Sequence, residues 1–267
     1  MNAIELGPLV LSGERFAIIV GVAVFLLGAG VLASRVSPRF NGWSTVAVLA
    51  GLGAARLAHV VAHWSYFADD PLRALAVWQG GFIWAWALAP AAIAAVVMLR
   101  ERRLVAWAAA PVIAAALAGI ATERLTTGAE PVAAPAMTLA RLEGGAVNLA
   151  AVDGRPTVIN LWATWCPPCR REMPALAQAQ DAHPDVRFLF VNQGEGPEKV
   201  AGWLEQAGLG IDNVLLDRAM AVPRHYGTVG LPVTLFLGPD GRLAEVHVGE
   251  IAPEQIGAAI ARLRRNS

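Results

Sequence analysis

The sequence predicts an α-helical membrane bundle of four transmembrane helices, followed by a separate α/β domain. Hydrophobic residues make up 56% of the 267 residues and charged residues only 16%, which is too apolar for an ordinary soluble protein. Long uncharged runs are confined to the first 122 residues, and a Pro- and Ala-rich stretch follows them. We therefore predict a membrane domain over 1–122, a linker over 123–137 and a second domain over 138–267.

Four apolar segments predict the transmembrane helices. They cover residues 16–33, 43–64, 80–99 and 104–121. Each has about 18–22 residues, close to the ~20 that cross a ~30 Å hydrocarbon layer as a helix. Lipid offers no hydrogen-bond partner to the backbone, so such segments must be helical. This pattern indicates a multi-pass protein of the inner (cytoplasmic) membrane, in contact with the lipid bilayer.

A cleaved signal peptide is the alternative for the first apolar segment. The residues before it carry Glu5 and Glu14 but no basic residue up to position 14. No small-residue cleavage site leads into a soluble domain, because three more apolar segments follow. We therefore interpret the segment as a membrane helix.

The placement of arginines predicts the orientation of the bundle. Arg35 and Arg39 follow the first segment, and three more arginines lie in the loop 100–103 between the third and fourth segments. The loop between the second and third segments contains Asp69, Asp70 and a single arginine. Arginine-rich short loops stay in the cytoplasm. We therefore expect both termini and the second domain on the periplasmic (extracytoplasmic) side, where disulfides are permitted.

Ionisable side chains interrupt the second apolar segment. Arg56, His59 and His63 are one and two helical turns apart and share one face. A His pair at this spacing could ligate a metal or haem. The other three segments add no acidic or histidine ligand. We therefore expect the three side chains to face the bundle interior or a polar cavity, with no metal and no cofactor.

The membrane half resembles a known family of membrane enzymes. The stretches 4–8 (IELGP), 51–57 (GLGAARL) and 71–82 (PLRALAVWQGGF) are similar to the N-terminal part of prolipoprotein diacylglyceryl transferases. In that family a functional His-Gly pair follows the Gly-Gly turn, whereas residues 83–87 (IWAWA) follow here. The family's later catalytic helices are replaced by the linker and the second domain. The resemblance implies a truncated, degenerate anchor or docking module, with lipid modification as the alternative.

The second half contains both cysteines, at a strand–turn–helix junction. Residues 157–162 form an apolar run typical of a buried strand, and 170–182 read as a helix after the motif WCPPC. A cysteine at a helix N-terminus feels the positive end of the dipole and spare N–H groups, which stabilise its thiolate. The thiolate is the species that attacks disulfides. We therefore predict that Cys166 is the nucleophile and that Cys169, one turn deeper, resolves the mixed disulfide.

The cysteine pair could alternatively bind zinc or form a purely structural disulfide. Zinc binding needs a second pair or nearby histidines, but His183 and His225 are isolated. A structural disulfide that closes so short a loop would stabilise the fold little.

A nucleic-acid partner is not expected, because the formal net charge is zero and no long basic run occurs.

The remaining pattern continues as an α/β domain. Further strands are predicted over 186–191, 233–237 and 243–248, and further helices over 197–207 and 253–264. Leu231 and Pro232 precede one of these strands. A proline there is either an edge residue or part of a cis bond. Beside a C-x-x-C motif we favour a cis Leu231–Pro232 bond that faces the sulfurs.

These features resemble the TlpA/ResA-type thioredoxin-like proteins over about residues 137–265. The matching motifs are WCPPC at 165–169, REMP at 171–174, GLP at 230–232 and DG at 240–241. The resemblance implies an α/β thioredoxin-like domain that reduces protein disulfides, often in cytochrome c maturation. It places Cys166, Cys169, Glu172 and Pro232 in catalysis, and Trp165, Pro167 and Leu231 in substrate binding.

Glu172 and Asn160 are two polar residues near the cysteine motif. Glu172 matches the family's active-site glutamate, which tunes the pKa of the thiols and can pass protons. The alternative is a carboxylate favoured by the helix dipole alone. Asn160 stands where ordinary thioredoxins have a buried aspartate, so that proton acceptor is absent.

The sequence therefore predicts a membrane-anchored thiol–disulfide oxidoreductase that works through a redox-active disulfide between Cys166 and Cys169. Reduction of protein disulfides is the favoured direction, and a disulfide oxidant or a redox sensor of the same fold are the alternatives. The membrane half has no cysteine and cannot relay electrons by thiol exchange. The expected partners are protein disulfide substrates and a separate membrane protein that donates electrons.

Overall fold

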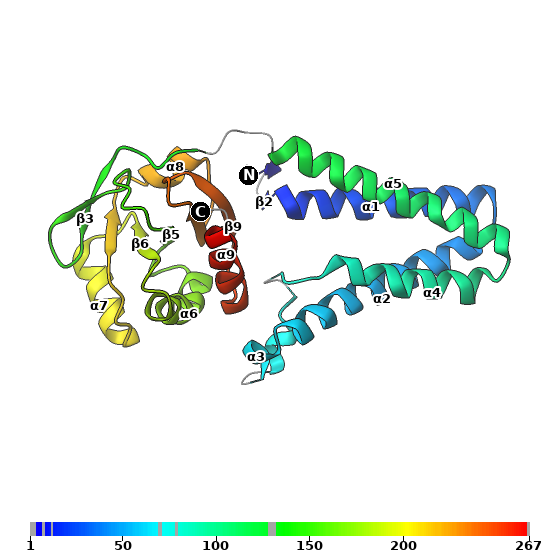
Figure 1. The fold of residues 1–267 in the computed structure, drawn as a ribbon, viewed down its shortest axis with the longest axis horizontal. Helices are drawn as coiled ribbons and strands as arrows, with labels where there is room; N and C mark the ends of the chain where they lie inside the picture. The colour runs from blue at the N-terminus through cyan, green and yellow to red at the C-terminus, as the bar shows by residue number, and fades with distance from the viewer. Residues whose placement is uncertain are drawn as a thin grey trace. The chain divides into compact units, whose positions relative to one another are not determined.

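The computed structural model describes residues 4–6, 9–11, 13–68, 71–77, 80–127 and 132–265, with side chains from Phe16 onward. Asp69 and Asp70 of the predicted outer loop, and residues 128–131 of the predicted linker, lie outside this set. The chain divides into two compact units, Gly13–Thr127 and Gly128–Ser267, the second of which also takes in Met1–Ser12 (Figure 1). Strands β1 (Ile4–Leu6) and β2 (Leu9–Leu11) pair antiparallel.

The first unit is helical. Its elements are α1 (Gly13–Arg35), α2 (Arg39–Ala62), α3 (Trp64–Phe67), the 3-10 helices η1 (Pro71–Leu75) and η3 (Trp84–Ala87), α4 (Leu88–Leu99) and α5 (Arg102–Thr127). Helices α1, α2 and α5 are long and apolar enough to cross a membrane. These spans identify a membrane-anchored protein.

The third predicted span is shorter in the structure than in the sequence pattern. It comprises η3 and α4, which together cover Trp84–Leu99. Gly80 and Gly81 have φ values of 84° and 77°, and this left-handed backbone cannot continue a right-handed helix. Helix α5, by contrast, continues to Thr127 and so runs into the segment predicted as a linker.

Large apolar side chains face both the inside and the outside of this unit. Phe40, Trp43 and Leu99 are fully buried in its core, where the Trp43 indole Nε1–H donates to the Ala91 carbonyl at 3.1 Å. Many others point outward. They include Leu27, Val31, Leu49, Leu57, Val61, Ile93, Val96, Val97, Ile113 and Leu117. An apolar outer surface of this kind suits contact with lipid rather than water.

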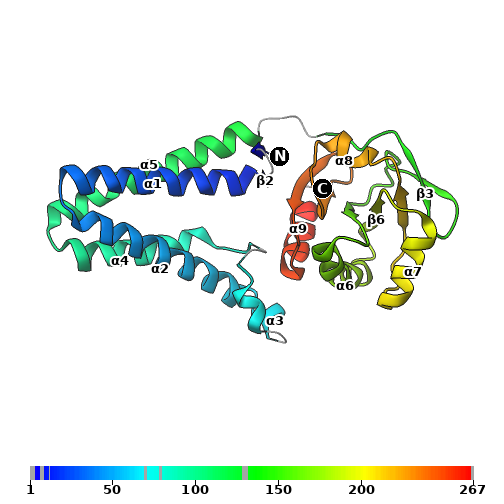
Figure 2. The same ribbon diagram turned by 180° about the vertical axis from the view of Figure 1, so that it is seen from behind.

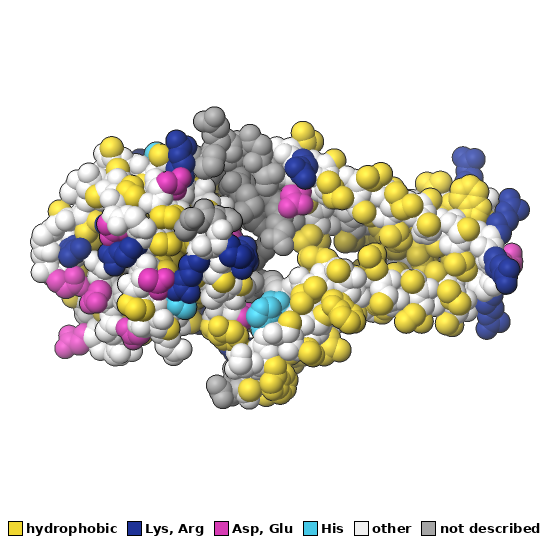
Figure 3. Space-filling model, viewed as in Figure 1, with side chains coloured by type: hydrophobic (Ala, Val, Ile, Leu, Met, Phe, Trp, Pro, Cys, Tyr) yellow, Lys and Arg dark blue, Asp and Glu magenta, His cyan; other side chains and the backbone are white. Residues whose placement is uncertain are grey.

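The arginines of the two predicted cytoplasmic loops lie at the same end of the helical unit, as Figure 3 shows. Arg39, at the start of α2, contacts the turn between α4 and α5. Its Nη1 lies 3.3 Å from Glu101 Oε1 and donates to the Leu99 carbonyl at 3.5 Å. The prediction that these two loops share one side is therefore confirmed.

Arg56 is buried and ties α2 to the irregular segment that follows it. Its guanidinium donates to the carbonyls of Arg73, Ala74, Gly80 and Gly81 at 2.6–3.0 Å. A Cβ atom at Gly81 would lie 2.6 Å from His59 Nε2 and 2.9 Å from Arg56 Nη1, so only glycine fits there. The predicted inward orientation is confirmed for Arg56 and His59, because each is only 7% exposed. His63, at the end of α2, is only partly buried.

The second unit is an α/β domain built on a seven-stranded sheet. The strand order is β4-β3-β7-β6-β5-β8-β9. The strands are β3 (Thr138–Arg141), β4 (Ala146–Asn148), β5 (Thr157–Trp162), β6 (Arg187–Gln193), β7 (Val214–Asp217), β8 (Val233–Leu237) and β9 (Leu243–Val248). Strands β5, β6 and β7 run parallel, while β8 and β9 pair antiparallel beside β5.

Helices cover both faces of this sheet (Figures 1 and 2). They are α6 (Pro167–Ala182), α7 (Pro197–Ala207), α8 (Ala221–Tyr226) and α9 (Pro253–Arg265). Val158 and Trp162 of β5 pack with α6, α7 and α9, whereas Ile159 and Leu161 pack with α8 on the other face. Alternate side chains of β5 thus enter the cores on the two faces of the sheet. Strand β5 lies between β6 and β8, and the chain continues from its C-terminal end into α6.

Candidate active site

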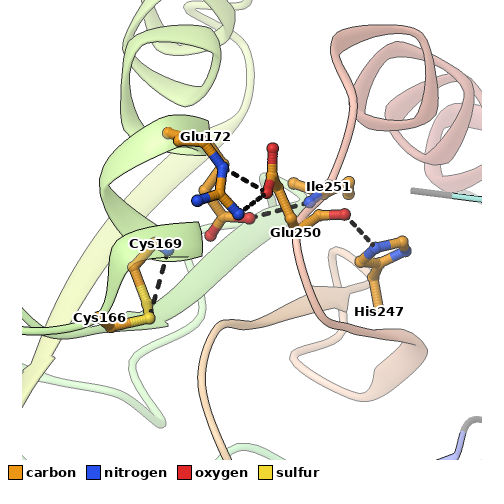
Figure 4. Close-up of polar contacts among 7 residues, drawn as sticks. Cys166, Cys169, Glu172, His247, Glu250 and Ile251 are labelled. Carbon is orange, nitrogen blue, oxygen red and sulfur yellow. Dashed lines mark hydrogen bonds and ion pairs between the residues drawn. A yellow bond between two sulfur atoms is a disulfide. The ribbon is translucent and has the colours of Figure 1, made fainter. Parts of the chain in front are cut away.

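Cys166 and Cys169 form a disulfide at the N-terminus of α6 (Figure 4). Cys166 is the N-cap residue, with extended backbone at φ −91° and ψ 105°. The backbone N–H of Cys169 donates to Cys166 Sγ at 3.2 Å. Cys166 is 4% exposed and Cys169 is fully buried. A thiolate at Cys166 would therefore meet a backbone donor and the positive end of the helix dipole.

Glu172 lies on the next turn of α6 and is almost fully buried, at 2% exposure. Its Oε1 accepts from Asn160 Nδ2 at 2.8 Å, and its Oε2 accepts from the backbone N–H of Ile251 at 2.9 Å. Burial raises the pKa of Glu172 to about 8, although these two hydrogen bonds act to lower it. The carboxyl group is therefore protonated at neutral pH while the disulfide is present.

The short loop between β9 and α9 connects Glu172 to Pro232. The Leu231–Pro232 peptide bond is cis, as predicted, and its placement facing the sulfurs stays a prediction. The backbone N–H of Gly249 donates to the Pro232 carbonyl at 2.9 Å. Two residues later, Ile251 donates to Glu172. One loop thus supports both the proline and the glutamate.

A second buried carboxylate holds the turn that leads to Cys166. Glu195 follows β6 and accepts from the backbone N–H of Thr164 at 2.7 Å and from its hydroxyl at 2.6 Å. Asn192 and Lys199 also contact this carboxylate, at 2.9 Å and 2.7 Å. Burial acts to raise its pKa, but these partners lower the pKa to about 2. Glu195 is therefore ionised and fixes the turn two residues before Cys166.

Of the three residues predicted for substrate binding, Trp165 and Pro167 flank Cys166 in the sequence. Trp165 is 63% exposed and precedes Cys166, while Leu231 packs on the core cluster that contains both cysteines. Pro167 lines an open groove of about 540 Å³ between α6 and α7. Arg170 and Trp203 also line it, and the Arg170 guanidinium lies 5.9 Å from the centre of the Trp203 ring.

The structure adds contacts that reading the sequence missed. Asn160 was noted as a replacement for an aspartate, but its bond to Glu172 was not expected. A polar residue inside an apolar strand needs a buried partner, and this signal could have led to Glu172. Glu195 and Ile251 gave no local signal. In the described ranges, no group of three or more His, Cys, Asp or Glu side chains could hold a metal ion.

Comparisons with known proteins divide at the same place as the two units. Residues 132–246 match the family model described as AhpC/TSA family. Residues 2–126 match the model described as prolipoprotein diacylglyceryl transferase. The two halves of the chain thus resemble two different families.

The individual relatives cover the second half. The chain is 33% identical over 125 residues to the thiol-disulfide oxidoreductase ResA of Geobacillus thermodenitrificans, covering 46% of this chain and 71% of the relative. It is 27% identical over 143 residues to ResA of Bacillus thuringiensis, covering 53% and 80%. A solved thiol:disulfide interchange protein from Chlorobium tepidum is 23% identical, with a TM-score of 0.46 over 51% of this chain and 99% of that one.

Proposed function

Because the chain belongs to the ResA-type family of thiol–disulfide oxidoreductases, we propose that it reduces protein disulfides outside the cytoplasm. The observation that carries this proposal is the placement of Cys166 at the helix N-terminus, beside the Cys169 N–H and one turn from the buried Glu172. The family acts on thiols and disulfides. The direction of the reaction, the side of the membrane and the electron donor are our proposals.

The proposed reaction begins with the reduced pair. The Cys166 thiolate attacks one sulfur of a substrate disulfide, so that a mixed disulfide forms and one substrate thiolate leaves. Cys169 then attacks Cys166 Sγ, the Cys166–Cys169 bond forms and the second substrate thiolate leaves. The substrate gains two electrons and the cysteine pair loses them.

Glu172 is the proposed acceptor of the Cys169 proton. Cys169 must lose its proton before it can attack, and Glu172 lies three residues further along the same helix. In the disulfide form burial raises the pKa of Glu172 to about 8. The glutamate is then protonated at neutral pH. This is the state expected after Glu172 has accepted the proton of Cys169.

The reduction potential of the full chain tests the direction of the reaction. We expect a value near that of thioredoxin, about −270 mV, because a reductase needs a weakly oxidising disulfide. The potential is read from the fraction of disulfide at equilibrium with defined dithiol buffers, and the Cys169→Ser variant gives the background. A value near −120 mV would mean a disulfide oxidant and would remove the cytochrome-maturation hypothesis.

A separate membrane protein is the proposed electron donor. A reductase must be reduced again after each turnover, and the first 165 residues contain no cysteine that could pass electrons. We assign the helical unit Gly13–Thr127 to an anchor in the inner membrane and residues 138–267 to the catalytic domain. Residues 83–87 replace the His-Gly pair of the diacylglyceryl transferases, which favours an anchor over a lipid-modifying enzyme.

The orientation can be tested with reporter fusions. We expect alkaline phosphatase fused after Ser267 to be active, because the arginine-rich end of the helical unit stays in the cytoplasm. The same enzyme fused after Arg39 is the matched control and should be inactive. The opposite pattern would place the thioredoxin-like unit in the cytoplasm and would contradict the proposed compartment.

A further inference from the structure

An ion pair lies directly outside Glu172 (Figure 4). Arg171 Nε and Nη2 both donate to Glu250 Oε2, at 2.9 and 2.6 Å. The Glu250 side chain is only 11% exposed, whereas that of Arg171 is 57% exposed. Arg171 precedes Glu172 in α6, and Glu250 precedes Ile251, whose N–H donates to Glu172. The opposite charges of Arg171 and Glu250 therefore lie next to the buried carboxyl group of Glu172. Arg171 belongs to α6 and Glu250 to the β9–α9 loop, which are far apart in the sequence.

We propose that Arg171 and Glu250 are positioning residues that balance the charge around Glu172 and so set the pH at which Glu172 ionises. The inference rests on the proposed role of Glu172 in proton transfer. Their ion pair also joins α6 to the β9–α9 loop, and this holds the Ile251 N–H at the Glu172 carboxyl. Neither residue touches the reacting sulfur atoms in this assignment.

The other groups near this ion pair are neutral on α6, β5 and β8, and titratable on β9 and α9. The two cysteines carry no charge as a disulfide, and β5 and β8 present the neutral Asn160 and Thr234. The β9–α9 segment adds His247, whose Nε2 contacts the Glu250 carbonyl at 3.2 Å. It also adds the buried Glu254 at the start of α9.

The two charges of the pair act on Glu172 in opposite directions. After burial and the hydrogen bonds from Ile251 and Asn160, the charge of Glu250 raises the pKa of Glu172 and the charge of Arg171 lowers it. Removal of one member leaves the other uncompensated. A purely structural role would give the same direction of change for both removals, because either one would loosen the loop and the Ile251 hydrogen bond.

The test is an infrared titration of the oxidised full chain in lipid nanodiscs. The carboxyl stretch of Glu172 is the band that the Glu172→Gln variant lacks. Glu250→Gln should lower the titration midpoint and Arg171→Gln should raise it, each by about half a pH unit. The double variant should return toward the wild-type midpoint. Arg171→Lys, which keeps the charge, should stay close to wild type.

A matched control is an ion pair between β9 and α9, the two elements that flank the loop carrying Glu250. Glu245→Gln breaks the Glu245–Arg262 ion pair, whose closest contact is 2.8 Å, and should leave the Glu172 midpoint in place. The proposal is overturned if both single variants shift the midpoint in the same direction, or if neither shifts it. The proposed role of Glu172 in proton transfer fails by a different result, namely a Glu172→Gln variant with unchanged activity and unchanged titration of the Cys166 thiol. The proposed reductase function fails by a third result, a reduction potential near −120 mV.

Discussion

Replacement of Cys166 by alanine is expected to lower multiple-turnover disulfide reduction by about three orders of magnitude or more. Cys166 is the N-cap of α6, and its Sγ accepts a hydrogen bond from the Cys169 N–H, so Cys166 carries the stabilised thiolate. Cys169 is fully buried and cannot take its place. The measurement is insulin reduction by the full chain with dithiothreitol as the electron source, corrected for the rate of dithiothreitol alone.

Cys169→Ser is the matched variant. It keeps the attacking thiolate but cannot resolve the mixed disulfide, so after pre-reduction and removal of dithiothreitol a covalent adduct with the substrate should accumulate on a non-reducing gel. If the adduct forms with Cys166→Ala instead, the roles of the two cysteines are reversed. A wild-type protein that completes only one turnover would favour a redox sensor over an enzyme.

The stability of the oxidised protein is expected to fall as the pH rises from about 4.5 to about 8. Glu172 has an ordinary pKa of 4.5 and a pKa of about 8 in the folded protein, where burial disfavours its charged form. Between these values the unfolded chain has lost the proton and the folded chain keeps it. The stability that Glu172 contributes is therefore complete below pH 4.5 and is lost by about pH 8, at up to about 1.4 kcal/mol per pH unit.

Glu172→Gln isolates this effect. The amide does not titrate, so the free energy of unfolding of the variant should lack this part of the pH dependence. The difference in this free energy, variant minus wild type, should therefore increase as the pH rises. Denaturant titrations of the full chain at several pH values measure the difference, with near-ultraviolet circular dichroism as the signal. Glu245→Gln serves as the control for loss of a half-buried, ion-paired carboxylate. Parallel curves for wild type and Glu172→Gln would show that the folded protein does not retain the extra proton.

The elements that depend on local patterns could be predicted from the amino-acid sequence alone. Strands β5, β8 and β9 and helix α7 have the predicted bounds, and α1 and α5 contain the first and fourth predicted membrane spans. Helix α2 covers the second predicted span only as far as Ala62. Their periodicity and length are properties of consecutive residues. The dithiol motif at the start of α6 was readable for the same reason, because Cys166 and Cys169 are separated by one helical turn. Strands β3, β4 and β7 were missed, since three or four residues are too few to show a period.

Only the tertiary structure decided the environment of the dithiol. Glu172 meets the Ile251 N–H across 79 residues of sequence, and Glu195 meets Thr164 across 31. Such contacts arise because sheet pairing brings strand ends together, which no local pattern encodes. The pKa of Glu172 follows from this burial and from those partners. The sequence therefore determined which groups carry the redox chemistry, whereas the fold decided their protonation, because desolvation and long-range hydrogen bonds exist only in the folded chain.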